Sequence, residues 1–206
     1  MSGAERFRRL WSGYTPGMLG ARNRYAVLCP LVEKEDGPHF LLEVRAAGLR
    51  QGGEICFPGG RAEEGESPEA CALRETFEEL AIPPAEVELI GKSDFLCHPG
   101  NFLLQPVLGI VSPVGLAAMQ PASAEVAEVF TVPVSWLRDN PPQVFSYDLK
   151  PEMKDNALYD ALGIAPDYRW RSGRADVPVW HYEGHVIWGM TARILRNILR
   201  RLEQDI

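Results

Sequence analysis

The stretch FPGGRAEEGESPEACALRETFEELAI, residues 57–82, joins a pair of glycines to a run that contains seven glutamates. Ser67 can cap a helix, Pro68 suits its first position, and the two prolines at 83–84 prevent its continuation. We therefore predict a helix over residues 67–81. At 100° per residue its apolar stripe consists of Ala70, Leu73, Phe77 and Leu80, and the opposite side carries Glu75, Glu78 and Glu79.

These three neighbouring carboxylates have two interpretations. They can form the solvated face of an amphipathic helix, although each like-charged pair then costs a few tenths of a kcal/mol. Alternatively, a cation compensates their charge, because hard divalent ions such as Mg²⁺ take oxygen ligands and bridge carboxylates to substrate phosphates. The spacing of the flanking residues favours the cation.

Fixed spacings connect the glycine pair to the glutamates. The order is glycine, five residues, glutamate, seven residues, an Arg-Glu pair, two residues and a Glu-Glu pair, which here are Gly60, Glu66, Arg74, Glu75, Glu78 and Glu79. This pattern closely resembles the Nudix box. Two positions depart from it, since Thr76 stands where an aliphatic residue is usual and Ala81 where the closing glycine is usual. Neither position is a metal ligand in the box.

The resemblance to the Nudix family implies both a fold and a set of roles. The fold is of the α/β class: an α/β/α sandwich with a central mixed sheet and the catalytic loop and helix packed at its edge. The implied cofactor is Mg²⁺ or Mn²⁺, and the implied ligands are Glu75, Glu78, Glu79 and the backbone carbonyl of Gly60. Gly59 is assigned to substrate binding, and Glu66 and Arg74 orient the loop and helix. The other glutamates of the stretch, Glu63, Glu64 and Glu69, fit no motif position and are expected to be solvated.

Residues 41–60, LLEVRAAGLRQGGEICFPGG, resemble the second signature of the coenzyme A pyrophosphatases within this superfamily. The matching positions are Leu41, Leu42, Arg45, Arg50, Gly53 and Phe57 to Gly60. Glu43 replaces the usual Thr, Ala46 replaces the usual Ser, and the gap before Gly53 is one residue short. Arg45 and Arg50 are candidates to bind substrate phosphates, because guanidinium forks suit phosphate oxygens. The alternative is that both are ordinary surface charges.

Two downstream segments, residues 121–137 and 185–195, also resemble this group. Glu125 is the candidate for a carboxylate supplied from outside the box, as general base or further metal ligand, and Glu128 is the fallback. The alternative is that either is a polar residue at the start of a strand. His181 and His185 are four residues apart in strand-like surroundings, which does not favour a metal pair.

The expected function is therefore metal-dependent cleavage of the diphosphate of coenzyme A or its derivatives, giving 4′-phosphopantetheine and adenosine 3′,5′-bisphosphate. Glu125 or a box glutamate would position or deprotonate the attacking water. One alternative is a Nudix pyrophosphatase for ADP-ribose or another nucleoside diphosphate derivative. Another is a non-catalytic Nudix-fold nucleotide sensor, which the complete set of box carboxylates and the short N-terminal segment disfavour.

The composition, 46% hydrophobic and 24% charged, is that of an ordinary globular protein. A net charge of -7 argues against a nucleic-acid binder, so the expected partner is a small-molecule substrate. No apolar run approaches the ~20 residues of a membrane span, and we expect no membrane association and a cytoplasmic location. The cysteines are widely spaced and expected to be buried reduced thiols: Cys29, Cys56, Cys71 and Cys97. The chain is expected to be a monomer or a homodimer.

We predict one domain over residues 1–206, with an N-terminal extension at 1–24, an irregular excursion at 139–178 and a C-terminal helix at 189–204. A short basic helix is expected at 4–11. Strands are expected at 25–32, 39–45, 87–95, 102–111, 125–134 and 179–189, with a hairpin turn at 35–38.

Overall fold

A mixed sheet forms the centre of the protein in this computed structural model, which describes residues 3–15, 17–20 and 23–204. The central strand β1 (Asn23–Lys34) pairs antiparallel with β2 (Gly37–Arg45) and parallel with β7 (Phe102–Val111). The main path runs β3-β2-β1-β7-β5, while β4 pairs with β1, β6 with β7 and β8 with β2. The remaining strands of this sheet are β3 (Ile55–Cys56), β4 (Gly59–Arg61), β5 (Val87–Lys92), β6 (Leu96–His98) and β8 (Val126–Pro133).

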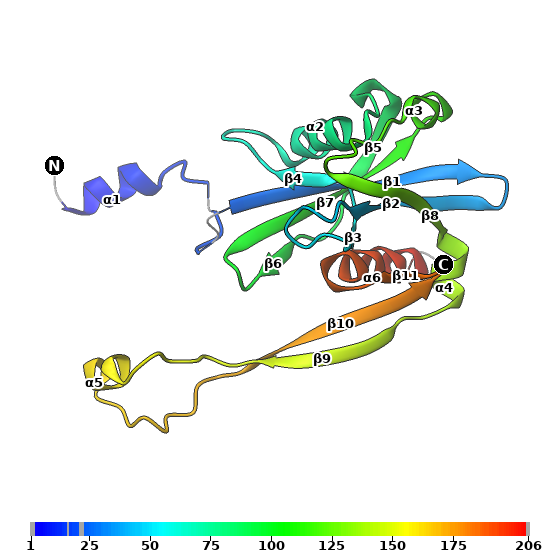
Figure 1. Cartoon of the computed structure of the whole chain (residues 1–206). Coiled ribbons are helices and arrows are strands. Elements are labelled where there is room, and N and C mark those ends of the chain that lie inside the picture. Colours follow the sequence, from blue (N-terminus) through cyan, green and yellow to red (C-terminus); the bar gives the residue numbers. More distant parts are fainter. Residues whose placement is uncertain (1–2, 16, 21–22, 205–206) are drawn as a thin grey trace.

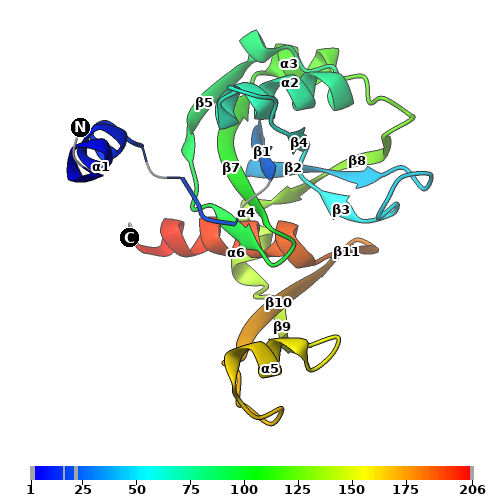
Figure 2. The same cartoon turned by 90° about the vertical axis from the view of Figure 1, so that its left-hand side faces the viewer.

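Helices cover both faces of this sheet (Figures 1 and 2). On one face lie α2 (Pro68–Leu80) and α3 (Pro113–Ala118), and on the other lies α6 (Gly189–Gln204). Side chains alternate along strand β2, so that it contributes to the packing on both faces of the sheet. Leu41 packs into the core cluster of α2, whereas Phe40 and Leu42 pack into the cluster of α6. The expected α/β/α sandwich with a central mixed sheet is confirmed.

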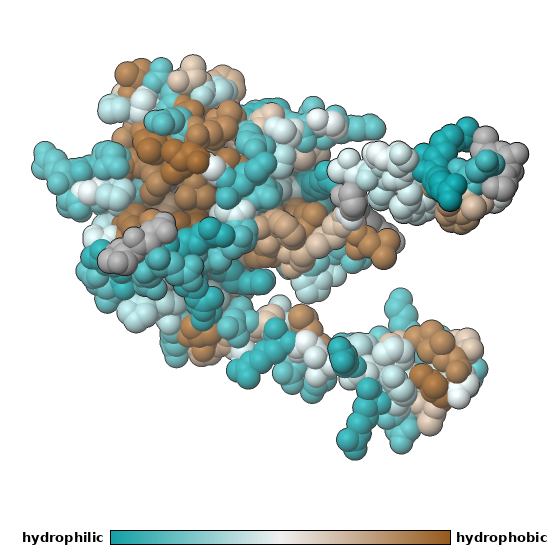
Figure 3. Space-filling model, turned by 180° about the vertical axis from the view of Figure 1, so that it is seen from behind, coloured by the Kyte–Doolittle hydropathy of each residue, from teal (hydrophilic) through white to brown (hydrophobic). Residues whose placement is uncertain are grey.

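An arm leaves the body after the short helix α4 (Val134–Asp139). It consists of the antiparallel strands β9 (Gln143–Leu149) and β10 (Gly173–Tyr182), with α5 (Ala157–Leu162) near its tip, and it leads to the short strand β11 (His185–Ile187). Apolar side chains gather at the tip (Figure 3). The segment 139–178 is thus more regular than its sequence indicates, because β9 and β10 pair with each other, and the inner end of β10 joins the core at Trp180.

The N-terminal helix α1 (Gly3–Trp11) stands apart from the sandwich, and none of its residues is buried. The short 3-10 helix η1 (Pro84–Glu86) follows α2. The strand expected at 87–95 ends earlier, at Lys92, after a register shift between Leu89 and Gly91. Within the described ranges, no helix has the length and apolarity required to cross a membrane.

Candidate active site

Helix α2 carries the glutamates and begins and ends with the expected signals. The Ser67 hydroxyl accepts a hydrogen bond from the Ala70 N–H at 3.1 Å, and Pro68 occupies the first turn. At the other end Ala81 adopts a left-handed conformation, with φ 56°, and its N–H donates to the Phe77 carbonyl. An alanine here completes the turn that the box normally assigns to glycine, at a cost in backbone strain.

The buried face of α2 differs from the predicted stripe. Phe77 is 50% exposed and Ala70 is exposed, so these two positions were predicted wrongly. The residues buried against the sheet are Cys71, Ala72, Thr76, Glu79 and Leu80. Two polar members of this face have internal partners: the Thr76 hydroxyl donates to the Ala72 carbonyl at 2.6 Å, and Glu79 accepts a backbone hydrogen bond. Because these bonds compensate for burial, apolarity alone does not reveal the inner face.

Glu79 is the most buried of the three box carboxylates, with only 3% of the residue exposed. The Gly59 N–H donates to its Oε2 at 2.8 Å, which fixes the glycine loop to the helix. Burial raises the pKa of Glu79 to about 8, and the negative charge of Glu43 adds to this effect. The hydrogen bond from Gly59 acts in the opposite direction.

The glycine pair allows this close approach of loop and helix. Both glycines pair with β1, Gly60 opposite Ala26 and Gly59 opposite Val27. A Cβ on Gly59 would overlap the Ala26 carbonyl and the Val27 backbone, and a Cβ on Gly60 would overlap the Glu75 carboxylate. The Gly60 carbonyl, a predicted metal ligand, lies 3.6 Å from the Cys71 thiol that donates to it.

Arg74 donates hydrogen bonds to three carboxylates, one on the loop before α2 and two on α2 itself. Its Nε and Nη2 donate to the two oxygens of Glu66 at 2.9 and 3.0 Å, and its Nη1 donates to Glu75 at 2.8 Å and Glu78 at 3.2 Å. The paired hydrogen bonds from Arg74 hold the pKa of Glu66 down at about 2. The pKa of Glu75 is nevertheless raised, because burial outweighs the contact with Arg74. This geometry agrees with an orienting role for Glu66 and Arg74.

Glu125 reaches the same cluster from the loop before β8. The Ala122 N–H in this loop donates to the Glu79 backbone carbonyl at 2.8 Å. The charge of the exposed Glu125 raises the pKa of Glu75 and of Glu79. The fallback residue Glu128 is placed differently: it pairs with Val44 and its carboxylate lies 3.2 Å from His185 Nε2, on the α6 side of the sheet. Of the two candidate carboxylates from outside the box, Glu125 is therefore the one that lies near Glu75 and Glu79.

The two candidate phosphate-binding arginines are placed differently. Arg45 ends β2 in a partly buried position near Glu43 and Cys56. Burial raises the pKa of both groups, and the charge of Arg45 offsets only part of that rise. Arg50 is exposed on the loop between β2 and β3. Of the two arginines, Arg45 lies beside a buried acid, Glu43, whereas Arg50 is exposed to solvent.

The structure adds one residue that the sequence analysis did not select. Glu43 on β2 is only 1% exposed, and the Cys56 thiol donates to its Oε1 at 3.3 Å. Burial raises the pKa of Glu43 to about 7. The available signal was its position in LLEVR, where a charged residue replaces Thr inside an otherwise apolar strand. The thiols also differ from expectation, since Cys97 is exposed and Cys56 only partly buried.

The donor chemistry of this cluster fits a hard divalent cation. In the part of the chain that the structure describes, side-chain positions alone do not define a group of three or more His, Cys, Asp or Glu around a single point. Burial, and then the charges of neighbouring acids, raise the pKa of both Glu75 and Glu79. Glu75, Glu79 and the Gly60 carbonyl offer only oxygen donors, as Mg²⁺ and Mn²⁺ prefer.

The model of the NUDIX domain family matches residues 22–151. The chain belongs to the Nudix family. It is 33% identical over 191 residues to an uncharacterized Nudix hydrolase NudL of Photorhabdus laumondii, covering 91% of this chain and 90% of the relative. A second NudL, from Enterobacter sp. strain 638, is 36% identical over 86% of this chain and 81% of its own length. The crystal structure of RenU, a Nudix hydrolase from M. smegmatis, is similar over 57% of this chain and 74% of that one, at 23% identity and a TM-score of 0.46.

Membership in this family makes the chain a Nudix hydrolase, an enzyme that acts on pyrophosphate bonds. Nudix hydrolases generally use divalent metal ions and act on small-molecule nucleotide substrates. The oxygen donors of the box, on the buried Glu79, the partly buried Glu75 and the exposed Glu78, are compatible with such chemistry.

Proposed function

We propose that this Nudix hydrolase cleaves the diphosphate of coenzyme A or its derivatives, giving 4′-phosphopantetheine and adenosine 3′,5′-bisphosphate. The observation that carries the proposal is the position of Arg45 at the end of β2, beside the buried carboxylate cluster. A guanidinium there can hold one phosphate while the cluster serves the scissile bond. Arg50, exposed on the next loop, is available for the 3′-phosphate that distinguishes coenzyme A from simpler diphosphates.

The residues divide the chemistry among them. Glu75, Glu78, Glu79 and the Gly60 carbonyl would hold Mg²⁺ or Mn²⁺, which when bound polarises phosphorus and acidifies water. Arg74 fixes the directions of Glu75 and Glu78 through its two hydrogen bonds to them. Glu125 is exposed at the rim of the cluster, so it can accept the proton of the attacking water and return it to solvent. Gly59 is the further proposed substrate-binding residue, through its backbone, while its missing side chain makes room for Ala26 and Val27 of β1.

The rival substrate class is ADP-ribose or another nucleoside diphosphate derivative, which needs the same carboxylates but not Arg50. The test is hydrolysis of a panel with Mg²⁺ and with Mn²⁺: coenzyme A, dephospho-coenzyme A and ADP-ribose. We expect coenzyme A to be cleaved best, and Arg50→Ala to reduce its preference over the dephospho form. Cleavage of ADP-ribose without cleavage of coenzyme A would overturn the proposed substrate, while the proposed metal-dependent hydrolysis of a diphosphate would still hold.

We further propose a cytoplasmic location, which the four free cysteines support because reduced thiols persist in that compartment. The chain is proposed to act as a monomer or homodimer, with residues 1–206 forming one domain that includes the extension at 1–24. Its proposed partners are small molecules, without nucleic acid or membrane, in keeping with its negative net charge.

A further inference from the structure

A pocket of about 570 Å³ lies on the face of the sheet opposite to the box helix. Its floor is a row of residues on three neighbouring strands, in which Val44 of β2 pairs with Ile55 of β3 on one side and with Glu128 of β8 on the other. Directly opposite residues of paired strands point to the same face, and Val44 and Ile55 belong to the core cluster of α6. The volume is in the range of small-molecule sites.

The adjoining row on the same three strands faces the box helix. Glu43 pairs with Cys56 on one side and with Val129 on the other, and Val129 packs against the core cluster of α2. Side chains alternate between the two faces along each strand. The pocket and the layer of α2 therefore lie back to back on the same part of the sheet.

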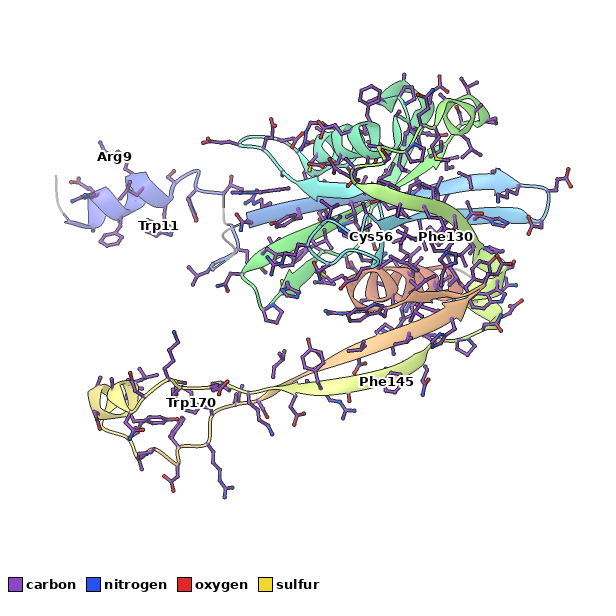
Figure 4. The ribbon with its side chains drawn as sticks, viewed as in Figure 1. Arg9, Trp11, Cys56, Phe130, Phe145 and Trp170 are labelled. Carbon is purple, nitrogen blue, oxygen red and sulfur yellow. The ribbon has the colours of Figure 1, made fainter. Side chains whose placement is uncertain are left out.

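The turn between β10 and β11 and the residues that follow it form the wall of the pocket. Glu183 and Gly184 make this turn with φ values of 47° and 85°, and β11 lies beside β3 (Figure 2). The ring of His185 stacks on Phe130, which Figure 4 shows inside the body of the protein, with the ring centroids 3.8 Å apart. Trp188 completes the wall and is 46% exposed. The pocket thus offers flat ring surfaces to a ligand.

Glu128 supplies a carboxylate with a fixed direction. Its Oε1 lies 3.2 Å from His185 Nε2, and the imidazole is the donor because a carboxylate only accepts. The other ring nitrogen, Nδ1, is buried and has no hydrogen-bond partner among the described residues, so the contact with Glu128 is the one that orients the ring. The side chain of Glu128 is still 55% exposed, and a ligand can donate to it. A flat ring that carries an N–H donor suits this combination.

The pocket and the box meet at the end of β2. Gly53, which lines the pocket, donates its N–H to the Arg45 carbonyl at 2.9 Å, and the Ala46 N–H donates to the Glu125 carbonyl at 2.8 Å. Arg50 is exposed on the loop between Ala46 and Gly53. A ligand that lies over this end of the sheet would have its ring in the pocket and its phosphates beside the arginines and Glu125.

We propose that this pocket binds the adenine base of the substrate, with the exocyclic amine donating to Glu128 and the ring lying against Trp188. The inference rests on the proposed function, because it takes the substrate to be an adenine nucleotide. It makes Glu128 and Trp188 specificity-determining residues outside the catalytic cluster. The competing interpretation is that the contact of Glu128 with His185 only holds β11 against β8.

The test is the binding of adenosine 5′-monophosphate (AMP) and inosine 5′-monophosphate (IMP) to the full chain, measured by isothermal titration calorimetry in the presence of EDTA. IMP carries a carbonyl oxygen where AMP carries the exocyclic amine, so two acceptors would face each other at Glu128. We expect wild type to prefer AMP at least about tenfold, the size of a hydrogen bond to a charged group. The amide of Glu128→Gln can donate as well as accept, so this variant should bind the two nucleotides about equally.

Trp188→Ala removes a flat surface of the pocket and should weaken AMP binding about tenfold, within the range for a base stacked on an aromatic side chain. Two matched controls should bind like wild type: Trp11→Ala at an exposed position of α1, and Glu88→Gln at an exposed position of β5. Thermal unfolding checks that all variants are folded. A wild-type chain that does not bind AMP, equal binding of AMP and IMP by wild type, or an unchanged preference in Glu128→Gln would overturn the inference. A purely structural contact with His185 predicts the last of these results.

Hydrolysis of coenzyme A separates failure of this inference from failure of the proposed function. If wild type cleaves coenzyme A with Mg²⁺ or Mn²⁺ while AMP and IMP bind equally, the pocket is not the adenine site and the proposed function stands. If the preference for AMP depends on Glu128 but coenzyme A is not cleaved, the adenine site stands and the proposed substrate is overturned.

Discussion

Among single residues, the decisive feature is a pair of buried acids, Glu43 and Glu79, which accept hydrogen bonds from the two ends of the segment 56–59. Within the described residues, the side chain of Glu43 accepts one hydrogen bond, from the Cys56 thiol, and that of Glu79 accepts one, from the Gly59 N–H. A buried carboxylate without full compensation destabilises the folded chain. Residues retained under such conditions are commonly functional, because perturbed acids concentrate at active sites.

Glu79→Gln is expected to reduce hydrolysis of the preferred substrate at least about 100-fold, since electrostatic contributions of single active-site groups are of this size. The amide oxygen can still accept the Gly59 N–H, and the buried charge is lost, so the unfolding temperature without metal should not fall. Steady-state hydrolysis and thermal unfolding measure the two effects. Glu64→Gln makes the same charge change at an exposed position and should remain within about twofold of wild type. Equal activity of the two variants would remove Glu79 from the mechanism.

Among the secondary-structure elements, α2 is stabilised by its capping residues and polar contacts as well as by its apolar face. The Ser67 cap fixes its start, Arg74 ties its middle to Glu66, and Ala81 ends it in the left-handed region. The strain at Ala81 is on the order of 1–2 kcal/mol for a residue with a Cβ.

Ala81→Gly should therefore stabilise the protein by about 1 kcal/mol, after the greater flexibility of glycine in the unfolded chain is taken into account. Ala70→Gly is the matched control, because it makes the same substitution at an exposed position inside the helix and should destabilise by up to about 1 kcal/mol. Urea unfolding at neutral pH gives both values. A loss of stability in Ala81→Gly would show that the left-handed turn is not strained.

The contact between Glu66 and Arg74 should make stability depend on pH. The pKa of Glu66 in the folded chain is about 2, below its ordinary value of 4.5. A lowered pKa stabilises the fold above pH 4.5, and this contribution disappears as the pH falls from 4.5 to 2. Glu66→Gln should thus be less stable than wild type at pH 6 and approach it near pH 2.

Urea unfolding at several pH values between 2 and 6 measures this difference. Glu64→Gln, whose side chain is exposed on the same loop, should follow the wild-type profile throughout. A constant difference between Glu66→Gln and wild type across this range would contradict an ionic contact.

Across the whole molecule, the compact sandwich and the protruding arm differ in how far their residues are buried. Every residue of β9 is exposed except the partly buried Leu149, whereas β1 and β7 are packed from both faces. The arm is anchored at its base by Trp180, whose indole N–H donates to the Asn140 carbonyl at 2.7 Å. Farther out, Phe145 and Trp170 lie on the arm away from the sandwich (Figure 4).

Amides of β9 are expected to exchange with solvent at least about 100-fold faster than amides of β1, because an isolated two-stranded ladder is marginally stable and opens locally. Hydrogen–deuterium exchange at low protein concentration measures both segments in one sample. Protection of β9 equal to that of β1 would contradict local opening. Protection that grows with protein concentration would show that a second copy covers the arm.

The family, the sandwich, the helix at 67–81 with its cap and most strands could be predicted from the amino-acid sequence, because these depend on local signals and fixed spacings. The number of residues between Gly60 and Glu79 is a property of the sequence, so the motif can be identified without knowing how the chain packs. It also identified Arg74 and Glu66 as a pair, which the structure joins by two hydrogen bonds.

Three features could be learned only from the packing of the folded chain: which side of α2 is buried, that Glu43 faces the layer of α2, and that Glu128 lies in the opposite layer. Each of these depends on contacts between distant segments: Gly59 with Glu79, Cys56 with Glu43, and Glu128 with His185. The free energy of burying a polar side chain depends on whether a hydrogen-bond partner is present, and that partner belongs to another part of the chain. Periodicity along one helix or strand carries no information about it.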